Sequence, residues 1–280
     1  MKIAITGSTG QLGKLVIEKL TTLTAASHLV ALARDLEKVK SLGIEGRLFD
    51  YSKPDMLAKA LIGIDKLLIV SSNEIGQRLA QHKNIIDAAK LAGVKHIVYT
   101  SLLHADTSSL SLAFEHLETE KILQASGITY TILRNGWYTE NFLGSLSSII
   151  ANSKVFAASG EGKIAAATRQ DYALAAAKVL TTSGHENKIY ELAGDIAFNM
   201  QEFSDSISKV TNQKITFQNL TAENYKNQLI QFGLPEGLAE FLSQTDVEIE
   251  KGQLYSDSKD LSQLIERPTT SLEQAIIDAL

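Results

Sequence analysis

The first half of the chain alternates short apolar runs with helical segments, and this alternation restricts the possible folds more than any other feature. Runs bounded by Gly, Ser, Asn or Asp predict strands at 3–6, 29–33, 47–49, 67–70, 97–100 and 129–133. Helices are predicted near 12–20, 36–42, 54–61, 76–92 and 112–125. Continuously apolar strands separated by helices are typical of a parallel sheet, whose neighbouring strands need crossover connections. The sequence therefore predicts an α/β fold with a Rossmann-type, doubly wound parallel sheet.

The regularity decreases after residue 135. The patterns there predict helices near 138–151, 171–180 and 201–210 and strands near 189–192 and 215–217, followed by helices to residue 280. We expect residues 1–135 to form a Rossmann domain, with 153–182 crossing back to it. Residues 136–152 and 183–280 are expected to form a smaller α/β domain on the substrate side.

The composition excludes several classes of protein. The chain has no cysteine, so disulfides, thiolate metal sites and thiol catalysis are absent. Its net charge of −5 argues against a general nucleic-acid binder. No apolar stretch reaches the ~18 residues of a membrane span, and no signal-peptide pattern opens the chain, so we expect a cytoplasmic protein. No His-Glu-x-x-His or Gly-x-Ser-x-Gly motif indicates a metal site or a serine hydrolase, and nothing indicates an oligomeric state.

A glycine-rich segment follows the first predicted strand and opens the first helix. Its spacing is G-x-x-G-x-x-G, and its residues are Gly7, Ser8, Thr9, Gly10, Gln11, Leu12 and Gly13. In dinucleotide-binding folds such glycines permit a tight turn, close approach of a pyrophosphate and close packing of helix on sheet. The helix N-terminus also offers unpaired N–H donors to phosphates. The alternative is an ordinary glycine-rich corner, but the strand–helix rhythm that follows favours a dinucleotide site.

The end of the second predicted strand indicates which dinucleotide is preferred. Arg34 stands where NAD-preferring sites usually place an acidic residue for the ribose 2′-hydroxyl. A guanidinium offers charge-assisted hydrogen bonds to a 2′-phosphate, so NADPH is favoured. Asp35 is more simply a helix N-cap, and Lys38 adds positive charge one turn later. The alternative for Arg34 is a solvated charge at a strand end.

Polar residues follow two further strands. Asp50 comes after the third strand, where it is placed either to contact an adenine edge or to form a surface turn. Ser71, Ser72 and Asn73 end the fourth strand. Ligands of open α/β sheets lie beyond the carboxyl ends of the strands, so we expect these groups to line the cofactor cleft.

The acid/base tyrosine of short-chain dehydrogenases is missing. A Tyr-x-x-x-Lys pair is expected on the helix after the fifth strand, but Leu117 stands in the tyrosine position, four residues before Lys121. Ser101 is present where that class places its serine. The one Tyr-x-x-x-Lys match, from Tyr255 to Lys259, lies far from the sheet in chain order and is interpreted as coincidental.

The missing phenol restricts the reaction. Hydride delivery to a ketone makes an alkoxide whose conjugate acid has a pKa near ~16, by analogy with water. Delivery to a quinone makes a phenolate with a pKa near ~10. The difference of about six pKa units corresponds to about 8 kcal/mol in the free energy of the product anion. The phenolate is stabler by this amount, so its formation does not require a dedicated acid. The site therefore suits an electron-poor acceptor.

Two histidines follow the fifth predicted strand. His104 follows the fifth strand and is either a substrate contact or a simple loop residue. His116 and Glu120 lie four residues apart on the following helix, and their spacing predicts a solvated helix face.

Four segments of the chain resemble the NmrA-like atypical short-chain dehydrogenases, and within them the bacterial NAD(P)H:quinone oxidoreductases of type 2. The segments are ITGSTGQLG (5–13), YTSLLHADTS (99–108), LRNGWY (133–138) and YELAGD (190–195), and the resemblance extends through 234–239 and 268–270. It implies a Rossmann domain with a small C-terminal domain, NADPH as cofactor, and reduction of quinones to hydroquinones.

The resemblance also assigns residues by position. It implies phosphate contacts from Gly7 to Leu12, the 2′-phosphate on Arg34, and Ser71, Ser72 and Asn73 along the cofactor. The loop over the nicotinamide comprises Asn135, Gly136, Trp137, Tyr138, Thr139 and Glu140, and Arg169 is a further cofactor contact. From the residues themselves, Trp137 and Tyr138 supply flat surface on which a quinone can stack, or else pack at a domain interface.

The sequence leaves three functional hypotheses. The first is an NADPH-dependent quinone reductase that transfers hydride directly, without flavin or metal, with Lys121 holding the nicotinamide ribose. The second is an NAD(P)H-sensing regulatory protein that binds dinucleotide without turnover, which the missing tyrosine fits equally well. A third, weaker hypothesis is reduction of another activated double bond or carbonyl.

Overall fold

Seven parallel strands form the main sheet of the computed structural model, which describes residues 1–280. Their order is β3-β2-β1-β4-β5-β6-β8, so the chain reverses direction across the sheet between β1 and β4. The strands are β1 (Ile3–Ile5), β2 (Leu29–Ala33), β3 (Glu45–Leu48), β4 (Lys66–Ile69), β5 (His96–Leu102), β6 (Thr129–Asn135) and β8 (Lys188–Leu192). The predicted Rossmann-type parallel sheet is confirmed, and all the carboxyl ends of its strands meet at one edge.

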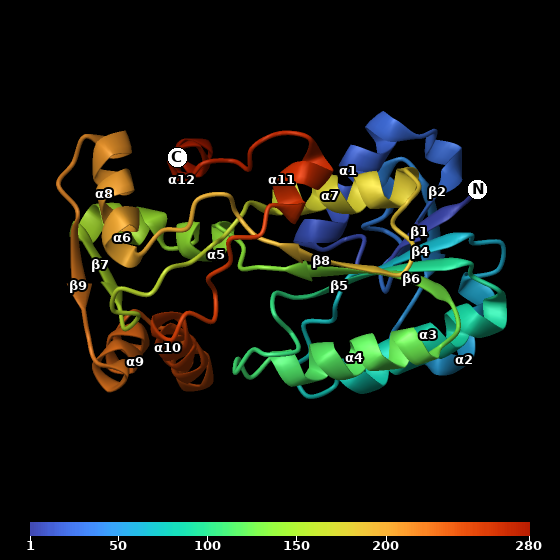
Figure 1. Ribbon diagram of the computed structural model, residues 1–280, viewed down its shortest axis with the longest axis horizontal. Helices are drawn as coiled ribbons and strands as arrows, with labels where there is room; N and C mark the ends of the chain where they lie inside the picture. Colours follow the sequence, from blue (N-terminus) through green and yellow to red (C-terminus); the bar gives the residue numbers. More distant parts are fainter.

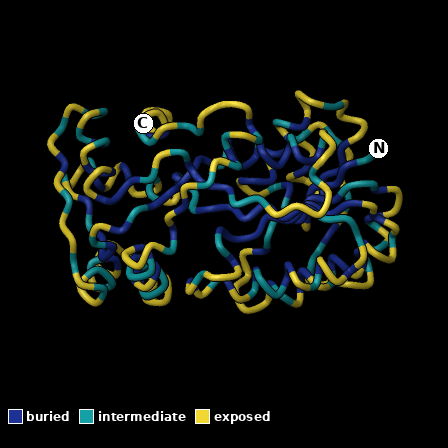
Figure 2. The backbone as a smooth tube through the Cα atoms, in the orientation of Figure 1, coloured by how far each residue is buried: buried dark blue, intermediate teal, exposed yellow.

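Helices cover both faces of this sheet, as Figure 1 shows. One face carries α1 (Gln11–Leu23), α7 (Arg169–Thr181) and α11 (Asp260–Ile265), and the other carries α2 (Pro54–Ala60), α3 (Arg78–Ala92) and α4 (Ala113–Ala125). The strands β1 and β5 are buried along their whole length, and two apolar clusters fill the spaces between sheet and helices (Figure 2). Burial on both faces explains why these strands are continuously apolar.

A second lobe lies beyond the carboxyl edge of the sheet (Figure 1). Its two-stranded parallel sheet pairs β7 (Lys154–Ala157) with β9 (Thr216–Asn219). Around it lie α5 (Glu140–Leu143), α6 (Leu146–Asn152), α8 (Met200–Thr211), α9 (Ala222–Gln231), α10 (Glu236–Glu250) and α12 (Leu272–Ala279). A third apolar cluster joins these elements to Leu102 at the end of β5, so the second lobe packs directly on the sheet edge.

Two predicted helices differ in the structure. The helix expected at 36–42 is wrong, because only a 3-10 turn forms at Lys40–Leu42. The Asp35 side chain accepts from the Glu37 amide at 2.9 Å, and only Val39 of this segment is fully buried, so no apolar face stabilises a longer helix. The helix expected at 138–151 forms as two shorter helices, α5 and α6.

The pairing of two strands differs from the expected division into domains. The strand predicted near 189–192 forms as β8, but it pairs with β6 in the main sheet. Residues 154–157, expected to return to the Rossmann domain, pair with β9 in the second lobe, whereas α7 does return. Strand pairing at long sequence separation decides both placements, and local sequence does not encode it. The division into two domains otherwise stays a prediction.

The turn from β1 into α1 depends on glycine at two positions. Gly7 has a left-handed φ of +57°, which favours glycine. A Cβ at Gly13 would overlap the Gly7 carbonyl oxygen, so only glycine lets α1 approach the loop this closely. The close approach directs the N-terminus of α1 at the carboxyl edge of the sheet.

We expect Gly13→Ala to lower the free energy of unfolding by about 2 kcal/mol or more, since the added methyl group collides with backbone that cannot move aside. Urea unfolding checks this. Gly237→Ala in α10 is the matched control, because a Cβ there meets nothing within 4 Å and alanine favours the helix. Equal stability of Gly13→Ala and the wild type would contradict the packing argument.

Candidate functional site

A cleft of about 570 Å³ opens at the carboxyl ends of β1, β2 and β4. It is the place where the chain reverses across the sheet, the usual ligand site of open α/β sheets. Thirteen of the predicted site residues line it together: Gly7, Thr9, Gly10, Gln11, Leu12, Gly13, Arg34, Asp50, Ser71, Ser72, Asn73, Tyr138 and Arg169. The structure thus brings residues from six separate parts of the chain into one hollow.

The glycine loop shapes one wall of this cleft. The Gly10 amide donates to the Gly7 carbonyl at 2.8 Å, closing a tight turn before α1. Gly10 is the N-cap of α1 and has no side chain to satisfy the amides of the first turn. These amides and the positive end of the helix dipole favour an anion such as a phosphate. Ser8 does not line the cleft, because it is fully buried and its hydroxyl donates to the Leu32 carbonyl at 3.0 Å.

Basic side chains lie at the far end of the cleft. Arg34 and Lys38 both line it, and the Arg34 side chain is 68% exposed. Arg34 Nη1 lies 3.2 Å from Oε1 of Glu74, which follows β4 on the opposite side of the cleft. An exposed pair of this kind contributes little to stability, so a stronger anionic partner can displace Glu74. Asp50 accepts from the Ser52 amide at 3.1 Å while lining the same end.

The other end of the cleft is closed by an aromatic–cation pair. The Arg169 guanidinium lies over the Tyr138 ring, 4.4 Å from its centroid. Glu140 does not line the cleft; its carboxylate accepts from the Arg169 amide at 2.9 Å and lies 3.5 Å from the Arg169 guanidinium. Glu140 therefore positions the start of α7. Burial raises the pKa of Tyr138, so its hydroxyl stays protonated near neutrality.

Three further residues of the predicted nicotinamide loop lie behind the cleft wall. Asn135 and Thr139 are buried, and the Gly136 amide donates to the Leu192 carbonyl at 2.8 Å. The Asn135 Oδ1 atom is buried without a hydrogen-bond partner. Asn135 is not among the residues that line the cleft, so its predicted contact with the cofactor has no support from this arrangement.

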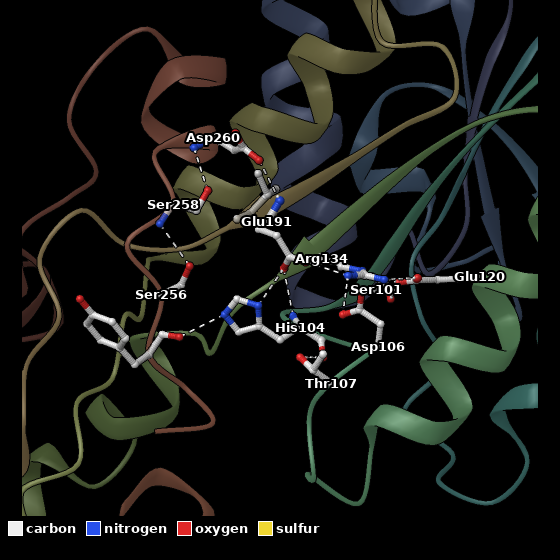
Figure 3. A network of polar contacts seen from close by, with 12 residues as sticks. Ser101, His104, Asp106, Thr107, Glu120, Arg134, Glu191, Ser256, Ser258 and Asp260 are labelled. Atoms are coloured by element: carbon white, nitrogen blue, oxygen red, sulfur yellow. Dashed lines mark hydrogen bonds and ion pairs between the residues drawn. The ribbon is translucent and has the colours of Figure 1, made fainter. Parts of the chain in front are cut away.

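Ser101, near the end of β5, contacts a buried ion pair of Glu120 with Arg134. The Ser101 hydroxyl donates to Glu120 Oε1 at 2.5 Å, and Arg134 donates to both oxygens of Glu120 at 3.0 and 2.8 Å (Figure 3). Burial acts to lower the pKa of Arg134, but hydrogen bonds to Glu120 and Glu191 raise it overall. Ser101 is thus held within the protein network and is not directed at the cleft.

The structure places Lys121 outside the cleft. Its Nζ pairs with Glu118 Oε1 at 2.7 Å on the solvent side of α4, while the preceding Glu120 points inward. Helical periodicity explains this, since adjacent residues point about 100° apart. The expected role of Lys121 in holding a ribose therefore has no support from this arrangement.

His104 joins the same network and lines neither the cleft nor the cavity described below. Its amide donates to Glu191 Oε2 at 2.9 Å, and its Nε2 lies 3.1 Å from the Tyr255 carbonyl oxygen (Figure 3). The ring thereby connects the segment after β5 to the chain after α10. The placement favours the simple loop role over substrate contact.

The predicted solvated face of α4 is wrong. His116 and Glu120 are 4% and 2% exposed, because α4 turns this face toward the sheet. His116 Nδ1 and the Tyr99 hydroxyl lie 2.7 Å apart in a hydrogen bond. Burial holds the pKa of His116 well below its usual range, so the ring is neutral.

Three polar residues of the cleft were missed from the sequence: Glu74, Arg78 and Gln81. Arg78 is 5% exposed, and its Nε donates to the Ser72 carbonyl at 2.7 Å. Gln81 accepts from the Ser72 hydroxyl and donates to Glu74 Oε2 at 2.7 Å. Their spacing could have indicated them, because Arg78 and Gln81 lie three residues apart on one face of the helix that follows the polar end of β4.

A second hollow, of about 460 Å³, lies in the second lobe. Its lining is mainly apolar and aromatic, with Trp137, Phe142, Phe156 and Phe203 among its walls. Asp246 of α10 also lines it and is 9% exposed. Burial raises the pKa of Asp246 to about 7. We call this hollow the aromatic cavity.

Two general features of the structure complete the site. The chain contains no group of three or more His, Cys, Asp or Glu side chains arranged to hold a metal ion. None of its helices combines the length and apolar character needed to cross a membrane.

The cleft is suited to a phosphorylated dinucleotide. The turn at the start of α1 presents amides without partners to an anion, and a Cβ at Gly13 would collide with the backbone of that turn. Arg34 and Lys38 line the same cleft and add positive charge to it. Fold and site define a dinucleotide-binding protein of the short-chain dehydrogenase type that lacks the catalytic tyrosine.

Comparison with known proteins identifies the family. The NmrA-like family model matches residues 1–276, and the chain belongs to that family. It is 51% identical to quinone oxidoreductase 2 of Escherichia coli (strain K12) over 98% of this chain and 97% of that protein.

Solved structures agree with this assignment. The crystal structure of the E. coli NADPH-dependent quinone oxidoreductase complexed with NADPH superposes with a TM-score of 0.96 at 51% identity, covering 99% of both chains. The Citrobacter sp. triphenylmethane reductase complexed with NADP(H) superposes with a TM-score of 0.97 at 39% identity, covering 100% of both chains.

We expect Asp246→Asn to stabilise the protein at high pH. The raised pKa means that the folded chain keeps a proton that the unfolded chain loses, so the stability of the wild type falls as pH rises from about 4 to 7. Asparagine does not ionise, so the variant does not lose stability for this reason as the pH rises. Its stabilising effect should be about 2 kcal/mol larger near pH 8.5 than near pH 5.5 in urea unfolding. Glu240→Gln, an exposed change on the same helix, should show no such difference; an equal effect at both pH values contradicts the burial argument.

Proposed function

We propose that this protein reduces quinones to hydroquinones with NADPH, by direct hydride transfer and without flavin or metal. The single observation that carries the proposal is the cleft, in which a phosphate-binding glycine loop and the basic pair Arg34 and Lys38 accompany a site without a tyrosine acid. The activity named for the E. coli relative, at 51% identity over almost the whole chain, supports it.

The cofactor would be held by groups that the cleft already presents. The amides at the start of α1 would bind the pyrophosphate, and Arg34 with Lys38 would bind the 2′-phosphate after displacing Glu74. Ser71, Ser72 and Asn73 would lie along the cofactor. Bound NADPH supplies the hydride.

The residues near the expected reaction centre suit an acceptor that needs no strong acid. Ser101 donates to Glu120, Lys121 lies in solvent, and no tyrosine stands in the acid position. A quinone becomes a phenolate, which is about six pKa units less basic than an alkoxide and takes its proton readily from water. Catalysis then comes mainly from holding donor and acceptor in contact.

The location and partners follow as further proposals. A chain without cysteine is compatible with the reducing cytoplasm, which we propose as its location. Its partner is a small quinone, and a net charge of −5 disfavours nucleic acid.

The test is steady-state oxidation of NADPH by 1,4-benzoquinone and 1,4-naphthoquinone, run in parallel with NADH. The purified protein should turn over without a flavin band in its absorption spectrum. Tight NADPH binding without turnover of any quinone would instead favour an NAD(P)H-sensing regulator and would overturn the proposal.

We expect Arg34→Glu to reduce the preference for NADPH over NADH at least ~10-fold, since charge-assisted hydrogen bonds contribute about 1.5–3 kcal/mol each. The measurement is the ratio of kcat/KM for the two cofactors. Lys90→Glu is the control, because Lys90 is exposed on α3 and outside the cleft. An unchanged ratio in Arg34→Glu would remove Arg34 from the cofactor site.

Lys121→Met should leave kcat and the Kd for NADPH within about twofold of the wild type, since an exposed ion pair contributes little and Nζ does not reach the cleft. Kinetics and cofactor titration check this. A large loss of kcat would show that Lys121 moves inward when the ligands bind.

A further inference from the structure

The aromatic cavity contains a carboxyl group for which the proposed cofactor site has no use. The Asp246 Oδ2 atom accepts from the Ala158 amide at 2.7 Å. No hydrogen bond or ion pair involves its Oδ1 atom, although the residue is 9% exposed and lines the cavity. A buried carboxyl group without a cationic partner is costly, and in enzymes such groups are often retained for function.

The cavity adjoins the cofactor cleft. Trp137, which lines the cavity, comes two residues after the end of β6 at the carboxyl edge of the sheet. The neighbouring Tyr138 lines the cleft, so the two hollows share this segment of chain in their walls. Arg169 of the cleft donates to Asn141 Oδ1 of the cavity at 2.8 Å, which joins their walls.

No charged group of the surrounding elements forms an ion pair with Asp246. Tyr225 of α9 lines the same cavity, and its pKa is raised by burial, so it is uncharged. Lys154 of β7 also lines the cavity, but it is exposed, and its Nζ lies 5.9 Å from the Phe156 ring centroid. On α8, Glu202 pairs with Lys163 at 2.7 Å.

The outer charges of α9 and α10 also have their own partners. Lys226 of α9 lies 2.8 Å from Glu240 and 3.2 Å from Glu236 of α10, on the exposed sides of the two helices. Burial is therefore the dominant influence on Asp246, and it raises the pKa to about 7. Asp246 is protonated in a large fraction of molecules at neutral pH and fully so in mild acid.

We propose that Asp246 determines which acceptor binds: its protonated carboxyl group donates a hydrogen bond to a carbonyl oxygen of a flat, uncharged aromatic quinone held in the aromatic cavity. This rests on the proposed function, which it extends to the acceptor. The aromatic walls stack on the rings, and the volume is within the range of small-molecule sites.

The protonation state of Asp246 sets the chemical class of the ligand. The protonated form is a donor, so it matches a carbonyl oxygen and adds no negative charge to the cavity. The carboxylate form offers only acceptors and a negative charge, so it repels the quinone oxygens and favours an organic cation. Quinone affinity should therefore fall as pH rises through about 7.

The only tryptophan of the chain, Trp137, reports on the cavity directly. The experiment follows its fluorescence during titration with 1,4-naphthoquinone, without NADPH, near pH 5.5 and near pH 8.5. The wild-type Kd should rise about tenfold or more with pH, because the donor form is lost. Asp246→Asn, which keeps an N–H donor, should bind almost equally at both pH values, whereas Asp246→Leu should bind weakly at both.

Glu240→Gln on the exposed side of α10 is the matched control and should behave as the wild type. N-methylquinolinium, a cation of the same two-ring size, should bind less tightly than naphthoquinone near pH 5.5. Wild-type binding that does not change with pH, a pH dependence that persists in Asp246→Asn, or a preference for the cation near pH 5.5 would each overturn the inference.

Turnover separates this inference from the proposed function. If the wild type and Asp246→Asn both oxidise NADPH with naphthoquinone and show the same pH profile of KM, this result would contradict the role of Asp246 but would still support the proposed reductase function. Binding with the expected pH dependence, but without NADPH oxidation, would support the cavity and overturn the reductase. The KM of Asp246→Leu for naphthoquinone should rise about tenfold, while its Kd for NADPH stays unchanged.

Discussion

Parallel pairing of β1 with β2 on one side and β4 on the other is the constraint on which the remaining structure depends. It brings the carboxyl ends of all seven strands to one edge and opens a crevice where the chain reverses. The close packing of α1 under Gly13 then directs unpaired amides into that crevice. The capacity of the cleft to accept an anion follows from backbone geometry, and side chains such as Arg34 add positive charge to it.

The buried ion pair of Glu120 with Arg134 explains how the fold tolerates the loss of the catalytic tyrosine. Glu120 binds Ser101 and Arg134, and Arg134 in turn reaches Glu191 of β8 (Figure 3). These contacts tie β5, β6 and β8 to α4 at the edge where short-chain dehydrogenases place their acid. The scaffold is kept, and the region has become structural. A reaction whose product anion is weakly basic is compatible with that change.

The cleft and the aromatic cavity are built from different elements. Strand ends and helix termini form the cleft, while helices of the second lobe form most of the cavity. The segment from Trp137 to Phe142 belongs to both walls, so a change there would affect both hollows. Asp246 comes from α10, more than one hundred residues later, and brings a titratable group into an otherwise apolar space.

The sequence by itself determined the parallel sheet and the cofactor end of the site, because strand ends such as Arg34 and the loop from Gly7 to Gly13 occupy positions that local pattern specifies. Only the tertiary structure decided the rest. It turned Glu120 inward and Lys121 outward, placed β8 in the main sheet, and buried Asp246 beside an aromatic cavity. These outcomes depend on which faces of distant helices and strands pack together, and the energy of such contacts is absent from any local stretch of sequence.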